Sequence, residues 1–116
     1  MLRFGVEFYE EKGISPVEEF LKNLINKEKV KIYKFIDLLE EKGLEMPYDY
    51  CKKLTHSELW ELKIDYGTNT FRIFYIYDNN KIILLHAIRK KTEKTPVSDK
   101  ELAEKRISDY LENRGG

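Results

Sequence analysis

The sequence has little of what metal, redox and nucleotide-binding proteins use: one cysteine, two histidines and six glycines among 116 residues. The lone Cys51 cannot form an internal disulfide, which excludes a disulfide-stabilised scaffold and favours a reducing, cytoplasmic setting. His56 and His86 lie on different predicted elements, and one cysteine completes no metal-ligand spacing with them. The glycines form neither a dinucleotide-binding nor a phosphate-binding loop. We therefore expect no metal and no nucleotide cofactor.

Long apolar runs are also missing. The longest, Ile82–Leu85, is far too short to span a bilayer, and no N-terminal apolar run precedes a cleavage-like site. Basic and acidic residues balance at 21 each, which argues against a uniformly basic nucleic-acid-binding domain. The length fits one domain covering residues 1–116. We expect a soluble, cytoplasmic domain without membrane contact.

The balanced total charge hides an uneven distribution along the chain. Residues 1–20 carry five glutamates against two cations, whereas residues 81–94 carry five cations against one glutamate. The stretch LLHAIRKKTEKTP, residues 84–96, begins as an apolar strand and ends as a cationic strip. Such a run is often only the solvated edge of a sheet, so charge alone does not decide whether an anionic partner binds it.

Hydrophobic periodicity predicts an α+β domain. An N-terminal strand precedes two helices that form a hairpin, the first capped by Ser15 and the second spanning roughly 27–42. Ser98 and Glu101 form a second capping box that predicts a C-terminal helix. Between the helix pair and this last helix, four strand-like segments predict a mainly antiparallel four-strand sheet with the helices on one side. The four segments are CKKLT, LWELKID, TFRIFYIY and KIILLHAIRK.

Charged side chains within the predicted sheet are the candidates for chemistry. Arg72 lies in an otherwise apolar stretch, where a buried cation needs a carboxylate, a phosphate or water. A structural ion pair with Glu61 or Asp65 and an anionic ligand are both open to it. Period-2 alternation places His86 beside Leu84 and Ile88, either as a satisfied core histidine or as a proton donor or acceptor. The full set is Glu61, Lys63, Arg72, His86, Arg89, Lys90 and Lys91.

Several aromatic residues accompany these charges in the predicted strands. Such rings are most often core or rim residues, although one of them stacking on a nucleotide base is the alternative. The residues concerned are Trp60, Tyr66, Tyr75 and Tyr77.

Three longer segments, VEFYEEKGISPVEEFLKNL, WELKIDYGTNTFRIFYIY and IILLHAIRKKTEKTP, together carry a family resemblance. In this order they resemble the RelE/HigB superfamily of bacterial toxins, and in particular its phage-derived HigB-like branch. The KKTEKTP segment combined with the upstream FRIFY strand is the most specific part. The resemblance covers nearly the whole chain.

The resemblance implies the toxin of a type II toxin–antitoxin pair, which acts as an mRNA interferase on messenger RNA, commonly at the ribosome. The implied fold is a small antiparallel sheet packed on a helical hairpin, and the implied partner is a HigA-like helix-turn-helix antitoxin. Metal-free RNA cleavage needs a base, an acid and a cation for the scissile phosphate. By the resemblance Arg72 is that cation, Lys63 is the base with Glu61 competing for the role, and His86 is the candidate acid. RNA would be held by Arg89, Lys90, Lys91 and Lys94.

Two other functions fit the same scaffold. A ParE-like toxin inhibits DNA gyrase by protein binding without a nuclease centre, and fold analogy alone does not exclude it. A non-toxic module that binds only its antitoxin and DNA is the third hypothesis.

The chain also departs from many family members, because Thr92 and Thr95 occupy the region where those members carry a C-terminal tyrosine or histidine.

Overall fold

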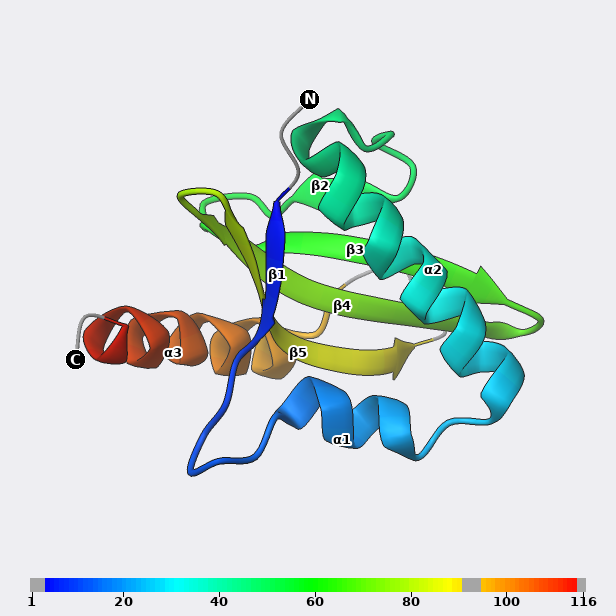
Figure 1. Cartoon of the computed structure of the whole chain (residues 1–116), viewed down its shortest axis with the longest axis horizontal. Coiled ribbons are helices and arrows are strands. Elements are labelled where there is room, and N and C mark those ends of the chain that lie inside the picture. The colour runs from blue at the N-terminus through cyan, green and yellow to red at the C-terminus, as the bar shows by residue number, and fades with distance from the viewer. Residues whose placement is uncertain (1–3, 91–94, 115–116) are drawn as a thin grey trace.

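The computed structural model describes residues 4–90 and 95–114 (Figure 1). No helix in these residues is long and apolar enough to cross a membrane. The element order agrees with the predicted strand, helix pair, strand series and final helix. The elements are β1 (Gly5–Phe8), α1 (Pro16–Lys22), α2 (Asn26–Lys42), a 3-10 turn η1 (Gly43–Glu45), β2 (Cys51–Lys53), β3 (Trp60–Tyr66), β4 (Asn69–Asp78), β5 (Lys81–Lys90) and α3 (Val97–Asn113).

The strands form one five-stranded mixed sheet in the order β1-β5-β4-β3-β2. Neighbouring strands from β2 to β5 are antiparallel, as predicted. The N-terminal strand β1 joins the sheet parallel to β5, with Gly5 opposite Lys81 and Phe8 opposite Leu84. The sheet therefore has one strand more than the predicted four, and β5 becomes an interior strand.

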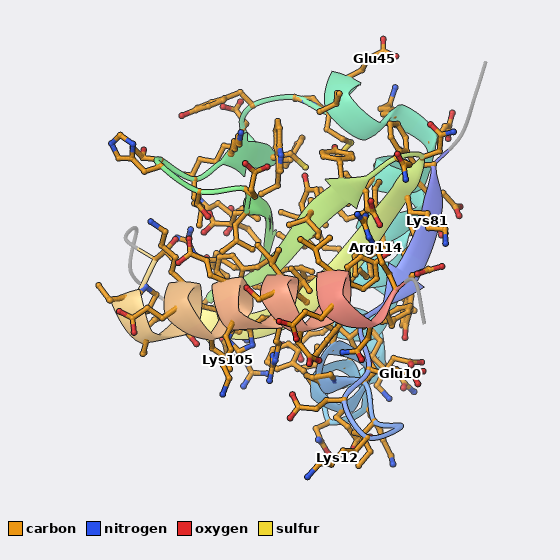
Figure 2. The ribbon with its side chains drawn as sticks, turned by 90° about the vertical axis from the view of Figure 1, so that its left-hand side faces the viewer. Glu10, Lys12, Glu45, Lys81, Lys105 and Arg114 are labelled. Atoms are coloured by element: carbon orange, nitrogen blue, oxygen red, sulfur yellow. The ribbon has the colours of Figure 1, made fainter. Side chains whose placement is uncertain are left out.

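Helices cover both faces of this sheet, so the prediction that they lie on one side is wrong. The α1 and α2 face is packed by residues such as Leu21 and Ile36 against Ile73 of β4. On the other face, Ala103 of α3 packs among Phe74, Ile76, Ile83 and Leu85. Figure 2 views the molecule with α3 in front of the strands. The physical reason is that β4 and β5 are apolar on both faces, and each face needs a cover.

The helix starts agree with the predicted capping at one helix and differ at two. Ser15 caps α1 by accepting a hydrogen bond of 3.1 Å from the Glu18 amide. The second helix begins at Asn26 with Ile25 as its N-cap, one residue before the predicted boundary. The last helix begins directly after the extended Pro96, so Ser98 lies inside the first turn instead of capping it.

Truncation of Leu84 tests the core on the α1 and α2 face. The Leu84 side chain is fully buried, so Leu84→Ala should lower the free energy of unfolding by about 2–5 kcal/mol through lost burial and the cavity left behind. The matched control is Leu44→Ala, because Leu44 is 64% exposed and its truncation should change stability by no more than about 0.5 kcal/mol. Equal effects in urea unfolding would contradict this assignment of the core.

Candidate functional site

Alternate residues of β3, β4 and β5 place polar side chains on the face of the sheet that α3 covers in part. Directly paired residues of antiparallel strands point to the same face, so the register defines three cross-strand rows. The structure thereby brings all four predicted catalytic side chains, and one predicted RNA-binding lysine, onto one face. The rows are Glu61–Phe74–His86, Lys63–Arg72–Ile88 and Asp65–Thr70–Lys90.

Arg72 and Glu61 form a buried ion pair in the middle of this face. Nη1 of Arg72 donates to Oε1 of Glu61 at 2.6 Å, and the two side chains are 2% and 1% exposed. The second oxygen of Glu61 accepts a hydrogen bond of 2.7 Å from Thr95 Oγ1, just before α3. Of the two options that the sequence left open for Arg72, the structure contains the ion pair with Glu61. Loss of either partner would leave a buried charge uncompensated.

His86 is held by α3 through both ring nitrogens. Nε2 lies 2.8 Å from Asp99 Oδ1, and Nδ1 lies 3.1 Å from Nη1 of Arg106, which also donates to the Leu85 carbonyl at 2.9 Å. A guanidinium only donates, so Nδ1 is assigned as the acceptor and Nε2 as the donor to Asp99. The ring stacks on Phe74 with centroids 5.9 Å apart. His86 therefore has the contacts of a satisfied histidine beneath a helix.

The predicted RNA-binding cations do not all share the surface of Arg72. Arg89 lies on the α1 and α2 face, with its guanidinium 5.3 Å from the centroid of the Phe71 ring and 3.6 Å from the buried carboxylate of Glu28. Lys90 is paired with Thr70 and belongs to the same face as Arg72. Lys91 and Lys94, which complete the predicted set, lie outside the described residues.

A small cavity lies beside the buried ion pair, with a volume of about 170 Å³. Glu61 and Lys63 of β3 and Arg72 of β4 line one part of it. The rest of the lining comes from β2 and from the loop that leads into β2. The loop is fixed to the sheet because the Lys63 amide donates to the Tyr50 carbonyl at 2.7 Å. The residues contributed by the loop and β2 are Tyr48, Asp49, Tyr50 and Lys52.

These loop residues are the part of the site that sequence reasoning missed. The loop follows Pro47 and has no periodicity, so its distance from the sheet is not encoded in an amphipathic pattern. The only available signal was compositional, namely two tyrosines and an aspartate at positions 48–50, one residue before the Lys52–Lys53 pair.

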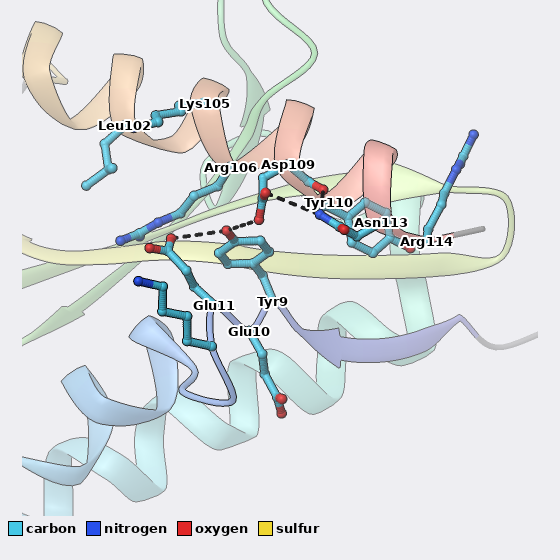
Figure 3. Close-up of a pocket in the computed structure, with 11 residues that line it drawn as sticks. Tyr9, Glu10, Glu11, Leu102, Lys105, Arg106, Asp109, Tyr110, Asn113 and Arg114 are labelled. Atoms are coloured by element: carbon cyan, nitrogen blue, oxygen red, sulfur yellow. Dashed lines mark hydrogen bonds between the residues drawn. The ribbon is translucent and has the colours of Figure 1, made fainter. Parts of the chain in front are cut away.

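A larger cavity lies elsewhere, between α3 and the segment after β1 (Figure 3). It has a volume of about 710 Å³ and is lined by side chains of both charge signs. The buried Tyr9 hydroxyl donates to Asp109 at 2.5 Å and lies 3.2 Å from Oε1 of Glu11, and Arg106 lies over the Tyr9 ring. Burial and the Asp109 carboxylate raise the pKa of Tyr9. The Tyr9–Asp109 hydrogen bond thus joins the N-terminal segment to α3, while the buried Nε of Arg106 has no hydrogen-bond partner among the described residues.

Polar contacts also attach the C-terminal end of α3. Tyr110 donates to Oδ2 of Asp78 at 2.8 Å, and Arg114 contacts Oδ1 of the same carboxylate. Hydrogen bonds from Arg114 and Tyr110 lower the pKa of Asp78. Burial, followed by the Asp78 carboxylate, raises the pKa of Tyr110 to about 12. Since Ala103 is the one fully buried residue in α3, these polar contacts carry much of its attachment.

Asp78→Asn should destabilise the protein in a pH-dependent way. The pKa of Asp78 is lower in the folded state than its ordinary value of 3.8, so the ionised carboxylate stabilises the fold above that value. This stabilisation is lost as the pH falls through the lower folded pKa. The difference in unfolding free energy between wild type and variant should be largest near neutral pH and shrink in acid, as measured by denaturant unfolding. The exposed Asp37→Asn serves as the control, and a pH-independent difference would contradict the assignment.

A double-mutant cycle tests the buried ion pair. Arg72→Met leaves the Glu61 carboxylate buried without its cation, and we expect a loss of about 3–5 kcal/mol in unfolding free energy. Adding Glu61→Leu removes the second charge and should restore most of that loss, because replacing a whole buried pair by apolar groups is often neutral. Urea unfolding of the four proteins gives the coupling free energy. Additive single effects would show that the two side chains are independent.

The α+β fold, with a five-strand mixed sheet and a C-terminal helix, is consistent with a RelE-like protein. Residues 19–108 match the family of phage-derived Gp49-like proteins (DUF891), and the chain belongs to this family. It is a RelE/HigB-like toxin family of type II toxin–antitoxin systems. No curated protein has significant similarity to the chain. The matched range contains the whole cavity above Arg72 and the Glu61–Arg72 pair.

Proposed function

We propose that the protein is the toxin of a type II toxin–antitoxin pair and acts as an mRNA interferase of the HigB type on ribosome-bound mRNA. Membership of a toxin family supports the first part. The observation that supports RNA cleavage is the cavity over Arg72, where lysines, a guanidinium, carboxylates and tyrosines meet on the sheet. The partner that restrains it is a HigA-like helix-turn-helix antitoxin.

The proposed reaction uses the 2′-hydroxyl of the RNA as the nucleophile. Its oxygen attacks the adjacent phosphorus and gives up its proton to the base, while the bond to the 5′-oxygen breaks and that oxygen receives a proton. The products are a 2′,3′-cyclic phosphate and a 5′-hydroxyl. Lys63 lies in the cavity beside Arg72 and is the proposed base, with Glu61 as the competing carboxylate. Arg72 stabilises the charge that develops on the phosphate oxygens.

The Glu61 contact gives Arg72 a defined orientation in this proposal. Glu61 contacts Nη1, and a guanidinium has five N–H donors in a planar fork. Arg72 lines the cavity, so a phosphate that enters would lie beside a cation already fixed in direction. His86 acts as the acid only if Asp99 and Arg106 release its nitrogens, which requires the first turns of α3 to leave the sheet.

A second candidate function is favoured by the burial of the same residues. Arg72 is 2% exposed and His86 is engaged on both sides of its ring, which is what a non-nuclease scaffold would retain for stability. In that case the toxin is ParE-like and acts by binding DNA gyrase, or the protein only binds its antitoxin. These alternatives require no exposed catalytic group on the sheet.

Induced expression of wild type and Lys63→Ala separates these functions. We expect wild type to arrest growth and to generate new 5′ ends within transcripts, and Lys63→Ala to lower the rate of cleavage on the order of 10²-fold. Lys53→Ala is the matched control, because Lys53 is an exposed lysine of β2 that does not line the cavity. Circular dichroism checks that each variant is folded.

Two outcomes would contradict RNA cleavage, and a third would contradict only the role of Lys63. Arrest without new 5′ ends but with loss of gyrase supercoiling would favour the ParE-like function. Strong expression without any growth defect would favour the antitoxin-binding module. Equal cleavage by wild type and Lys63→Ala would remove Lys63 from the site while leaving the nuclease function in place.

A further inference from the structure

The aromatic rings that the sequence offered for base stacking are not available for it. Tyr75 is fully buried, and Trp60 lies against both Tyr75 and Tyr77 with ring centroids 6.4 and 5.4 Å away. Lys31 covers the Tyr66 ring at 5.7 Å. All four belong to the α1 and α2 face, on the opposite side of the sheet from Arg72. A stacking surface near Arg72 must therefore come from another part of the chain.

The loop before β2 supplies such a surface at the rim of the cavity. Tyr48 is 76% exposed, and among the described residues its ring has neither a second aromatic ring nor a cation in stacking contact. Tyr50 is more restricted, because its ring meets Phe35 edge-on at 5.2 Å. Tyr48 thus lines the same cavity as Lys63 and Arg72 while most of its surface is open to solvent.

The size of the cavity limits what enters it. Pockets that enclose whole drug-sized molecules usually have volumes of roughly 300–1,000 Å³. The cavity over Arg72 has about 170 Å³, which suits a phosphate group better than a whole nucleotide. A nucleotide that places its phosphate here must leave its base outside, at the level of the rim where Tyr48 lies.

The charges around the cavity agree with a phosphate ligand. Glu61 and Arg72 balance each other as a contact ion pair. The remaining charged residues in the lining are Lys52 and Lys63 against Asp49, which leaves an excess of one positive charge. A peptide of acidic residues alone would satisfy the lysines equally well, but it carries no flat ring for the exposed face of Tyr48.

We propose that Tyr48 is a stacking platform for one base of a single-stranded nucleic acid whose phosphate occupies the cavity over Arg72. This inference rests on the proposed RNA-cleaving function and names the residue that positions the substrate. Stacking of a base on an aromatic side chain tolerates any base, so Tyr48 contributes to affinity and to the preference for unpaired strands, with little effect on sequence choice.

Fluorescence anisotropy of the full chain with a labelled, fully 2′-O-methylated single-stranded RNA tests the platform without cleavage. We expect Tyr48→Ala to weaken binding by about 5- to 100-fold and Tyr48→Trp to retain it, because indole also stacks. Tyr33→Ala is the matched control, since Tyr33 is 42% exposed on α2 and does not line this cavity. Duplex RNA and an acidic peptide serve as competing probes.

The outcomes separate this inference from the function on which it rests. If Tyr48→Ala binds the single-stranded RNA as tightly as wild type does, the platform is overturned. The nuclease function would then stand if cleavage still depends on Lys63. If wild type does not bind single-stranded RNA but binds the acidic peptide in a Tyr48-dependent way, the platform is overturned and a protein ligand is favoured. Equal loss in Tyr33→Ala and Tyr48→Ala also overturns it, because the effect is then not specific to the rim.

Discussion

The buried contact between Arg72 and Glu61 is the interaction on which the site depends. It joins β3 to β4 across the middle of the sheet, and through Thr95 it also reaches the start of α3. Taking two charges out of water is costly, so a pair of this kind persists only where its partners are fixed and hydrogen-bonded. Arg72, which this contact holds in place, also lines the small cavity beside the pair. The fold and the proposed chemistry therefore depend on the same ion pair.

The attachment of α3 to the sheet determines which groups on the charged face are accessible. Its contacts with the sheet combine apolar packing of Ala103, Ile107 and Tyr110 with polar contacts, from His86 near its start to Asp78 at its end. Polar contacts of this kind orient a helix closely while contributing less free energy than an apolar interface of similar size. The helix therefore sets which groups on this face are accessible, and His86 is the residue whose role depends most on it.

The sequence alone predicted the element order and the Ser15 cap, because each follows from local periodicity or capping chemistry, and it offered Glu61 as one partner for Arg72. Prediction from the sequence failed for features that depend on tertiary packing. A register shift at Phe74 and Tyr75 changes the alternation along β5, so Leu84 and His86 lie on opposite faces although two-residue spacing predicts the same face. The covering of both faces, and the approach of Tyr48 to the sheet, depend on long-range contacts that no local pattern records.

The most direct test of the RNA-cleaving account is the chemistry of the ends that purified protein generates on ribosome-bound mRNA. Attack by the 2′-hydroxyl predicts fragments with 2′,3′-cyclic phosphate and 5′-hydroxyl ends. Fragments with 5′-phosphate and 3′-hydroxyl ends would contradict it.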